Sequence, residues 1–361
     1  MLFSLEKVPN TGLDRLHEMI SGFYQSVFQG SSYDECFCTD LSSIRNESSK
    51  LAALMLDVYQ AYSDLGHQSR RAFQQRFDQE RNIQPLFDDL ASDITNLGAE
   101  HSDLWSKCKS LSNYLYAGVL RLQCFQNLSQ YSLDEHFEDF RNLNGNICCF
   151  CGLEEYAELR ELSEDLENLD ESQWRGDYDH LLCKSKYPFL SVDFENLVPT
   201  CRTCNRDAKG AIDILCLDSD RTVAFHPYRD EQGANWSLSV DVEDAFFMEW
   251  NVKFSSDNDM QRAKSDTWLF VYDIRARYQK RINDHSQSYY AASVRGTPNL
   301  SSAREALMKG AKDALCNMRN KRESFMEAEC LKVLSELDES VLNPIFLSIN
   351  DHFSGRDIID S

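Results

Sequence analysis

Two pairs of cysteines with C-x2-C spacing are the residues of this chain best suited to hold a metal ion. Cys148 and Cys151 form the first pair, and Cys201 and Cys204 form the second. Four thiolates complete the tetrahedral coordination of a structural zinc, so the zinc that they predict would have no open position for chemistry. The 49 residues between the pairs exceed the roughly 15 to 20 of a simple zinc ribbon. Two coincidental pairs of buried cysteines are therefore the alternative.

An Asp-His dipeptide and two asparagines lie between these pairs and immediately after them. An imidazole titrates near neutral pH, so His180 is the candidate general base that activates a water molecule. Asp179 and the amide of Asn205 offer the hard oxygen ligands that Mg²⁺ takes while it keeps several waters. Hydrolysis of a phosphodiester needs such a base and such an ion. Taken singly, His180, Asn196 and Asn205 are typical of a structural histidine, a turn and a helix cap.

Taken with both cysteine pairs, the segments Tyr-Asp-His, Asn-Leu-Val-Pro and Cys-Asn-x3-Lys resemble the HNH nuclease family, which has the ββα-metal fold. The resemblance covers about residues 147–209. It implies that Asp179-His180 ends the first strand, that Asn196 lies in the loop after the hairpin, and that Asn205 lies on the helix. It also implies that His180 is the general base and that the side-chain carbonyl of Asn196 orients its ring. Asp179 and Asn205 would bind the catalytic Mg²⁺ or Mn²⁺.

The same resemblance implies a metal-dependent endonuclease that cuts DNA and leaves a 5′-phosphate and a 3′-hydroxyl. The segment D-Y-D-H-L-L-x-K-S-K-Y-P, residues 177–188, is similar to HNH proteins of bacterial antiphage defence systems. These include Septu-like and retron-associated nucleases that work beside an ATPase, so DNA and a protein partner such as an ATPase subunit are expected. Two alternatives stay open: a non-catalytic zinc-binding adaptor and an RNA-cleaving HNH enzyme.

Four basic side chains near these residues are candidates for contacts with substrate phosphates: Lys184, Lys186, Arg206 and Lys209. Segment 172–229 has eight basic and eight acidic residues, whereas the whole chain has a formal net charge of -22. Because neutralisation of phosphates by Lys and Arg supplies most non-specific affinity, this charge argues against nucleic-acid binding by the whole surface. Contact with DNA must therefore be local or shared with a partner.

The elements that must position these residues form a mostly α fold with a small α+β insertion. Apolar residues recur at helical spacing from residue 50 to about 130, and we expect a helical N-terminal domain over 1–140. The HNH module with its four-cysteine zinc site is expected over 141–230. Alternation at 236–242 predicts a strand, the apolar run 268–272 fits a strand or a buried helix, and helical spacing then returns. We therefore expect a mixed, mainly helical C-terminal region over 231–361.

Charged segments outside the candidate site each allow two interpretations. The acidic stretch 152–173 has apolar residues, mostly leucines, every three or four positions, which predicts an amphipathic helix with a solvated face or, alternatively, a surface for a basic partner. The basic stretches 275–281 and 319–322 either line a substrate path or solvate helix faces.

The location of the protein is also predicted by composition. The first ten residues lack the features of a secretory signal, and no stretch approaches the ~18 apolar residues of a membrane span. The 13 cysteines are more typical of metal ligands and scattered thiols than of a disulfide framework. We expect a cytoplasmic protein without a membrane partner.

Overall fold

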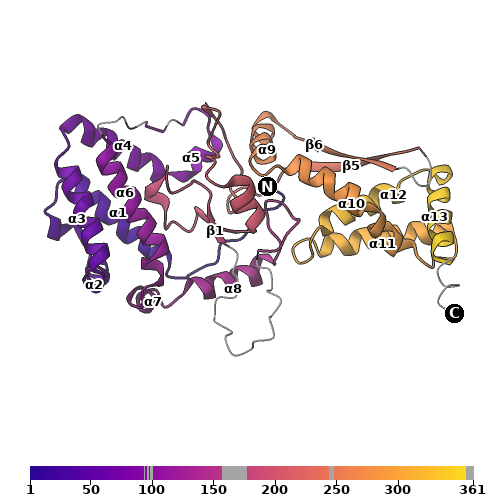
Figure 1. Ribbon diagram of the computed structural model, residues 1–361, viewed down its shortest axis with the longest axis horizontal. Helices are drawn as coiled ribbons and strands as arrows, with labels where there is room; N and C mark the ends of the chain where they lie inside the picture. Colours follow the sequence, from indigo (N-terminus) through magenta and orange to yellow (C-terminus); the bar gives the residue numbers. More distant parts are fainter. Residues whose placement is uncertain (93, 96, 98–100, 157–176, 244–247, 355–361) are drawn as a thin grey trace. The chain divides into compact units, whose positions relative to one another are not determined.

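The computed structural model describes residues 1–92, 94, 95, 97, 101–156, 177–243 and 248–354, and the chain divides into two compact units (Figure 1). The N-terminal unit consists of Leu5–Asn144 and Glu158–Asp230. The C-terminal unit consists of Met1–Ser4, Gly145–Ala157 and Glu231–Ser361. This division differs from the three consecutive domains expected from the sequence. The predicted acidic helix at 152–173 falls almost entirely outside the described residues.

Helices build most of the N-terminal unit. They are α1 (Asp14–Gln29), η1 (Tyr33–Cys36), α2 (Thr39–Glu47), α3 (Ser49–Ser63), α4 (His67–Arg81), α5 (Ile83–Asp88), α6 (Ser102–Ala117), η3 (Val119–Arg121), α7 (Gln123–Ser129) and α8 (Leu133–Asn144). Helices α3 and α6 pack against each other. Their apolar residues at helical spacing, such as Leu51, Met55, Leu111 and Leu115, are buried as the periodicity predicted.

A short hairpin followed by a helical turn completes this unit. Strand β1 (Asp177–His180) pairs antiparallel with β2 (Leu197–Thr200), so that His180 lies opposite Leu197. The connection contains η5 (Pro188–Leu190), and β2 leads into η6 (Thr203–Lys209), a π-helical segment. The two-residue strands β3 (Cys216–Leu217) and β4 (Asp220–Arg221) follow.

The hairpin shares one hydrophobic core with the helices. Tyr178, Phe189, Phe194 and Leu197 belong to the same buried cluster as the apolar faces of α1, α3, α4 and α6. A two-stranded hairpin of four-residue strands is not stable alone in water. Burial of its side chains among the helices explains why the predicted boundary near residue 141 does not separate it from them.

In its described residues, the C-terminal unit combines a longer hairpin with five helices. Its strands are β5 (Asn235–Val242) and β6 (Met248–Ser255), and its helices are α9 (Asp259–Val271), α10 (Ile274–Val294), α11 (Leu300–Cys316), α12 (Ser324–Ser335) and α13 (Glu339–Ser354). Helix α10 packs on β6 and α12 packs on β5. The alternation at 236–242 correctly predicted a strand, and the apolar run at 268–272 covers the last turn of α9 and its C-cap, so it is helical. Within the described ranges, no helix has both the length and the apolar character needed to cross a bilayer.

Candidate active site and metal centre

A tight turn in the C-terminal unit presents the first cysteine pair. Gly152 donates its backbone N–H to the Cys148 carbonyl at 2.8 Å and has a φ of 67°, a conformation that favours glycine. The turn is fixed from outside by two side chains. The Trp268 indole donates to the Phe150 carbonyl at 2.8 Å, and the Tyr278 hydroxyl donates to the Cys151 carbonyl at 3.0 Å.

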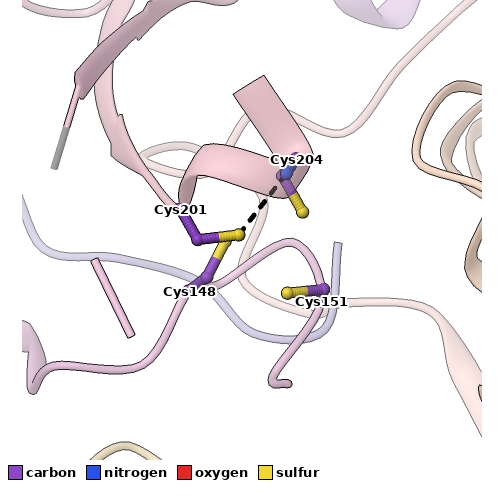
Figure 2. Close-up of side chains that lie close together, drawn as sticks. All are labelled: Cys148, Cys151, Cys201 and Cys204. Carbon is purple, nitrogen blue, oxygen red and sulfur yellow. Dashed lines mark hydrogen bonds between the residues drawn. The ribbon is translucent and has the colours of Figure 1, made fainter. Parts of the chain in front are cut away.

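The second pair lies at the start of the helical turn that follows β2. Cys201 comes directly after the strand, and Cys204 lies within η6. The Cys204 backbone N–H donates to Cys201 Sγ at 3.4 Å, which is the dashed line in Figure 2. An N–H directed at sulfur favours the thiolate form, because it stabilises the negative charge.

The four cysteine sulfurs converge. The Sγ atoms of Cys148, Cys151, Cys201 and Cys204 all lie within 4.8 Å of one another, and all four residues are buried (Figure 2). With a Zn–S bond of about 2.3 Å, the sulfurs of a tetrahedral site are about 3.8 Å apart, so the donor set fits such an ion. The predicted cysteines therefore form a group that can hold a metal ion such as zinc. Burial raises the pKa of Cys149 well above its usual value, and this residue is not part of the group.

His180 lies at the end of β1 with its ring almost fully buried. Its Nε2 is 2.9 Å from the carbonyl oxygen of Ser191. Because a carbonyl can only accept, Nε2 must carry the ring proton, and Nδ1 is then the basic nitrogen. Burial, together with the nearby Lys184 ammonium, lowers the pKa of His180 to about 3. The ring is therefore neutral at physiological pH.

The Asp179 carboxylate is buried beside a buried ammonium. Lys209, at 1% exposure, donates from Nζ to Asp179 Oδ1 at 2.9 Å and to the His180 carbonyl at 2.8 Å. Burial raises the pKa of Asp179, and Lys209 opposes this shift. Asp179 Oδ2 is also buried but has no hydrogen-bond partner among the described residues. Lys209, expected at a substrate phosphate, instead lies inside the protein and neutralises Asp179.

The ring-orienting contact expected from Asn196 is made by Ser191. Asn196 is fully buried and accepts from the Leu182 N–H at 2.8 Å through Oδ1. Its amide donates to the Leu182 and Leu190 carbonyls at 3.0 and 3.1 Å. Asn196 therefore binds the backbone of the loop after β1 at Leu182 and at Leu190, the residue before Ser191, whose carbonyl contacts His180. Through these bonds Asn196 positions the loop and so acts on the His180 ring only indirectly.

Asn205 lies on η6, four residues before Lys209. The Gly210 N–H donates to the Asn205 carbonyl at 2.8 Å, an i+5 bond that makes this segment π-helical. Such segments occur frequently at functional sites. The half-buried side chain of Asn205 has no hydrogen-bond partner in the described part of the chain. Among the described residues, neither the Asn205 amide oxygen nor Asp179 Oδ2 accepts a hydrogen bond.

The other predicted substrate contacts differ in exposure. Lys184 is half-buried, with Nζ 4.8 Å from the centre of the Tyr116 ring, and burial lowers its pKa. The Tyr116 ring is itself 4.6 Å from that of His180, so Lys184 lies on the His180 side of the loop. Lys186 is exposed and lies 3.4 Å from Asp213 Oδ2. Arg206 is exposed on η6.

An ion pair on α4, which the sequence reasoning missed, supports the loop after β1. Arg76 Nε binds Glu80 Oε1 at 2.6 Å, and the pair also holds the loop backbone. Arg76 donates to the Lys186 carbonyl at 2.6 Å, and Glu80 accepts from the Phe189 N–H at 3.3 Å. Burial raises the pKa of Glu80 to about 7. Arginine and glutamate four residues apart are common on helices, so the sequence contains no signal for this role.

The basic stretches 275–281 and 319–322 are largely neutralised within the C-terminal unit. Arg277 pairs with Glu154, Lys280 with Asp284, Arg281 with Glu323, Lys321 with Glu327, and Arg322 with Glu155. Cations that already have carboxylate partners attract phosphates weakly. Of the two interpretations of these stretches, the ion pairs favour solvated helix faces over a substrate path.

No protein-family model matches the chain, and neither a curated protein nor a solved structure is significantly similar to it. The likeness to HNH nucleases is therefore confined to the motifs between residues 147 and 209. No comparison identifies the chain as an HNH endonuclease.

Proposed function

We propose that this protein is a metal-dependent HNH-type endonuclease that hydrolyses phosphodiester bonds of DNA. The observation that carries the proposal is the buried Asp179 carboxylate, whose Oδ2 has no hydrogen-bond partner among the described residues. Its chain neighbour His180 holds its proton on Nε2. A carboxylate with a free oxygen and a neutral imidazole on neighbouring residues support the proposal, because phosphodiester hydrolysis requires an ion ligand and a general base.

The site residues have distinct roles in the proposed reaction. His180 Nδ1 accepts a proton from the attacking water, while the Ser191 carbonyl holds the proton on the other ring nitrogen. Asp179 Oδ2 and the Asn205 amide would hold the divalent ion. When bound, that ion neutralises charge on the scissile phosphate and the leaving oxygen. Lys184 and Arg206 would contact neighbouring phosphates.

The direct test is replacement of the base. In His180→Ala, we expect nicking of plasmid DNA with Mg²⁺ or Mn²⁺ to fall by about 100-fold or more, because general base catalysis is lost. Bound zinc and circular dichroism should not change. His67→Ala is the matched control, because His67 is exposed on α4. Full cleavage by His180→Ala would refute the assignment.

The substrate is DNA in this proposal. A matched assay on both polymers would show whether RNA is cleaved instead. The same base and ion can act on either polymer, since both have the phosphodiester. Duplex, single-stranded DNA and RNA of one sequence should be compared at equal concentration. If only RNA is cleaved, RNA is the substrate, and the proposed roles of His180 and Asp179 stay the same.

We further propose that the nuclease acts with a protein partner, such as an ATPase subunit of an antiphage defence complex. The formal net charge of -22 opposes approach to DNA, so a second protein with a basic surface would help to bring the substrate. Purified protein alone should therefore cut DNA slowly. Cleavage by the isolated chain at the rate of any complex would argue against a partner.

The Asp179–Lys209 pair favours a second candidate, a non-catalytic metal-binding adaptor. An ammonium that already neutralises Asp179 is what a site without a catalytic ion would contain. The two candidates differ in their response to Mg²⁺ and Mn²⁺. If neither ion changes the thermal stability of the protein or supports nicking, the adaptor is the better description.

A further inference from the structure

A second candidate binding site lies in the N-terminal unit, separate from Asp179 and His180. It is a cavity of about 650 Å³, within the usual range for small-molecule sites. Helix α6 contributes Trp105 and Lys109 to its wall. The loop after β1 contributes Lys186 and Tyr187, and Arg221 comes from β4.

The cavity wall is positively charged although the chain is strongly acidic. Four of its side chains are cationic, Arg76, Lys109, Lys186 and Arg221, and one is a carboxylate, Asp213. A concave wall of one sign concentrates oppositely charged ligands. The cavity is therefore suited to an anion.

Lys109 is the cation most available to such a ligand. Arg76 is paired with Glu80, and the Lys186 ammonium lies 3.4 Å from Asp213. Lys109 is half-buried, and its ammonium has no carboxylate partner among the described residues. It lies near the Trp105 ring, 5.9 Å from Nζ to the ring centre. An anionic group here would gain a charge-assisted hydrogen bond without breaking an existing ion pair.

Aromatic groups line the same wall. Trp105 and Tyr187 both lie close to the Arg76 guanidinium, which is 5.3 Å from one ring centre and 5.2 Å from the other. Flat aromatic and guanidinium groups are the surfaces on which nucleobases stack. Phosphate-binding cations beside such surfaces match the two halves of a nucleotide.

We propose that this cavity binds a single nucleotide, with its phosphate at Lys109 and its base beside Trp105 and Arg76. The nucleotide is either a free mononucleotide or one unpaired nucleotide of a longer strand, since both present the same groups. Helix α6 connects the cavity with His180, because its residue Trp105 lines the cavity and Tyr116, near its end, contacts the His180 ring. Trp105 and Tyr116 are eleven residues apart, about 16 Å along a helix, which equals about five nucleotides of a stacked strand.

Charge reversal on one face of α6 tests the proposal. AMP and a six-nucleotide single-stranded DNA are titrated by calorimetry into the full chain, in the His180→Ala background so that no strand is cut. Lys109→Glu should weaken binding by about tenfold or more, because an attractive contact becomes a repulsive one. Lys107→Glu is the matched control, because Lys107 lies on the same helix but pairs with Asp57 at 3.8 Å. Its effect should stay within about twofold.

The outcomes separate the two sources and the two proposals. A strand that binds about tenfold tighter than AMP identifies the substrate strand, and equal affinities identify a free nucleotide. Binding is measured without cleavage, so failure of the nuclease proposal leaves this result interpretable. Absence of binding by both probes would overturn the inference, as would equal weakening by Lys107→Glu and Lys109→Glu. Lys109→Gln, which only removes the charge, should weaken binding less than Lys109→Glu.

Discussion

The four-cysteine cluster and the Asp179 site differ in how their negative charge is balanced. They are adjacent in sequence, since Cys204 belongs to the cluster and Asn205 is a predicted ligand at the other site. Converging thiolates can be neutralised by a bound metal ion. At Asp179, by contrast, the buried Lys209 ammonium already supplies a positive charge. The first site should therefore depend on its ion for stability, whereas the second should keep its structure without one.

The largest expected effect is the loss of a cysteine ligand. Cys204→Ser should abolish stoichiometric zinc binding, because binding of structural zinc contributes about 10 kcal/mol or more in small zinc modules. We expect the midpoint of thermal unfolding to fall by about 10 °C or more. Zinc analysis and calorimetry measure both quantities. Cys316→Ser, at an exposed thiol, should change neither; equal effects of both substitutions would contradict a metal cluster.

A smaller effect should follow from removal of the ammonium at the second site. Lys209→Met leaves a buried carboxylate unpaired, which should cost about 3 to 5 kcal/mol of unfolding free energy without divalent ions. Mg²⁺ at about 100 times its dissociation constant should restore about 2.7 kcal/mol. Urea unfolding with and without Mg²⁺ measures this. In the Lys186–Asp213 pair the lysine is exposed, and Asp213 also accepts from the Tyr187 hydroxyl, so Lys186→Met should cost about 1 kcal/mol or less and should not respond to Mg²⁺.

Acidification should lower the unfolding free energy of the N-terminal unit, because this unit buries neutral histidines. Burial lowers the pKa of His136 and of His226 from 6.5 to about 4. The unfolded chain therefore binds more protons between about pH 6.5 and pH 4, and the unfolding free energy falls as the pH falls through this window. The loss is on the order of 1.4 kcal/mol per histidine for each pH unit inside the window.

His226→Phe is the variant that isolates this effect. Both ring nitrogens of His226 are buried without a hydrogen-bond partner among the described residues, and the ring packs against Phe87 with 4.8 Å between ring centres. Phenylalanine should fill the same space and remove one titrating group. Urea unfolding at pH 7 and pH 5 should give a smaller difference for the variant than for the wild type. An unchanged difference would exclude His226 as a source.

The smallest effect should come from Ser191→Ala. The Ser191 hydroxyl is buried and has no partner in the described part of the chain, so its loss removes no hydrogen bond. We expect the unfolding free energy to change by about 1 kcal/mol or less. Cleavage should change by about twofold or less, because the backbone carbonyl that orients His180 stays in place. A large loss of cleavage would show that the hydroxyl takes part.

Local patterns predicted much of the fold and the cysteine group. Helical spacing in α3 and α6, alternation in β5 and the two C-x2-C pairs each depend on residues two to four positions apart. These patterns can therefore be recognised in the sequence alone. The Asp-His dipeptide was correctly expected at the end of a strand, β1.

The contacts that define the second site could not be predicted in this way. The pairing of Lys209 with Asp179 and the support of the loop by Arg76 and Glu80 depend on which side chains tertiary packing buries together. Its place in the sequence beside the motif had made Lys209 a candidate for a substrate phosphate contact. Likewise, nothing in the sequence distinguishes Ser191, since its contact with His180 uses an atom that every residue has.

That last contact has a consequence for evolution. A main-chain oxygen cannot be deleted by a point mutation, so the tautomer of the imidazole is protected against most genetic change at position 191. Selection would act instead on the amide at position 196, whose bonds set the path of the loop. Aligned relatives should thus vary freely in side chain at the first position while keeping asparagine at the second, and a search for invariant columns would overlook the group that holds the proton.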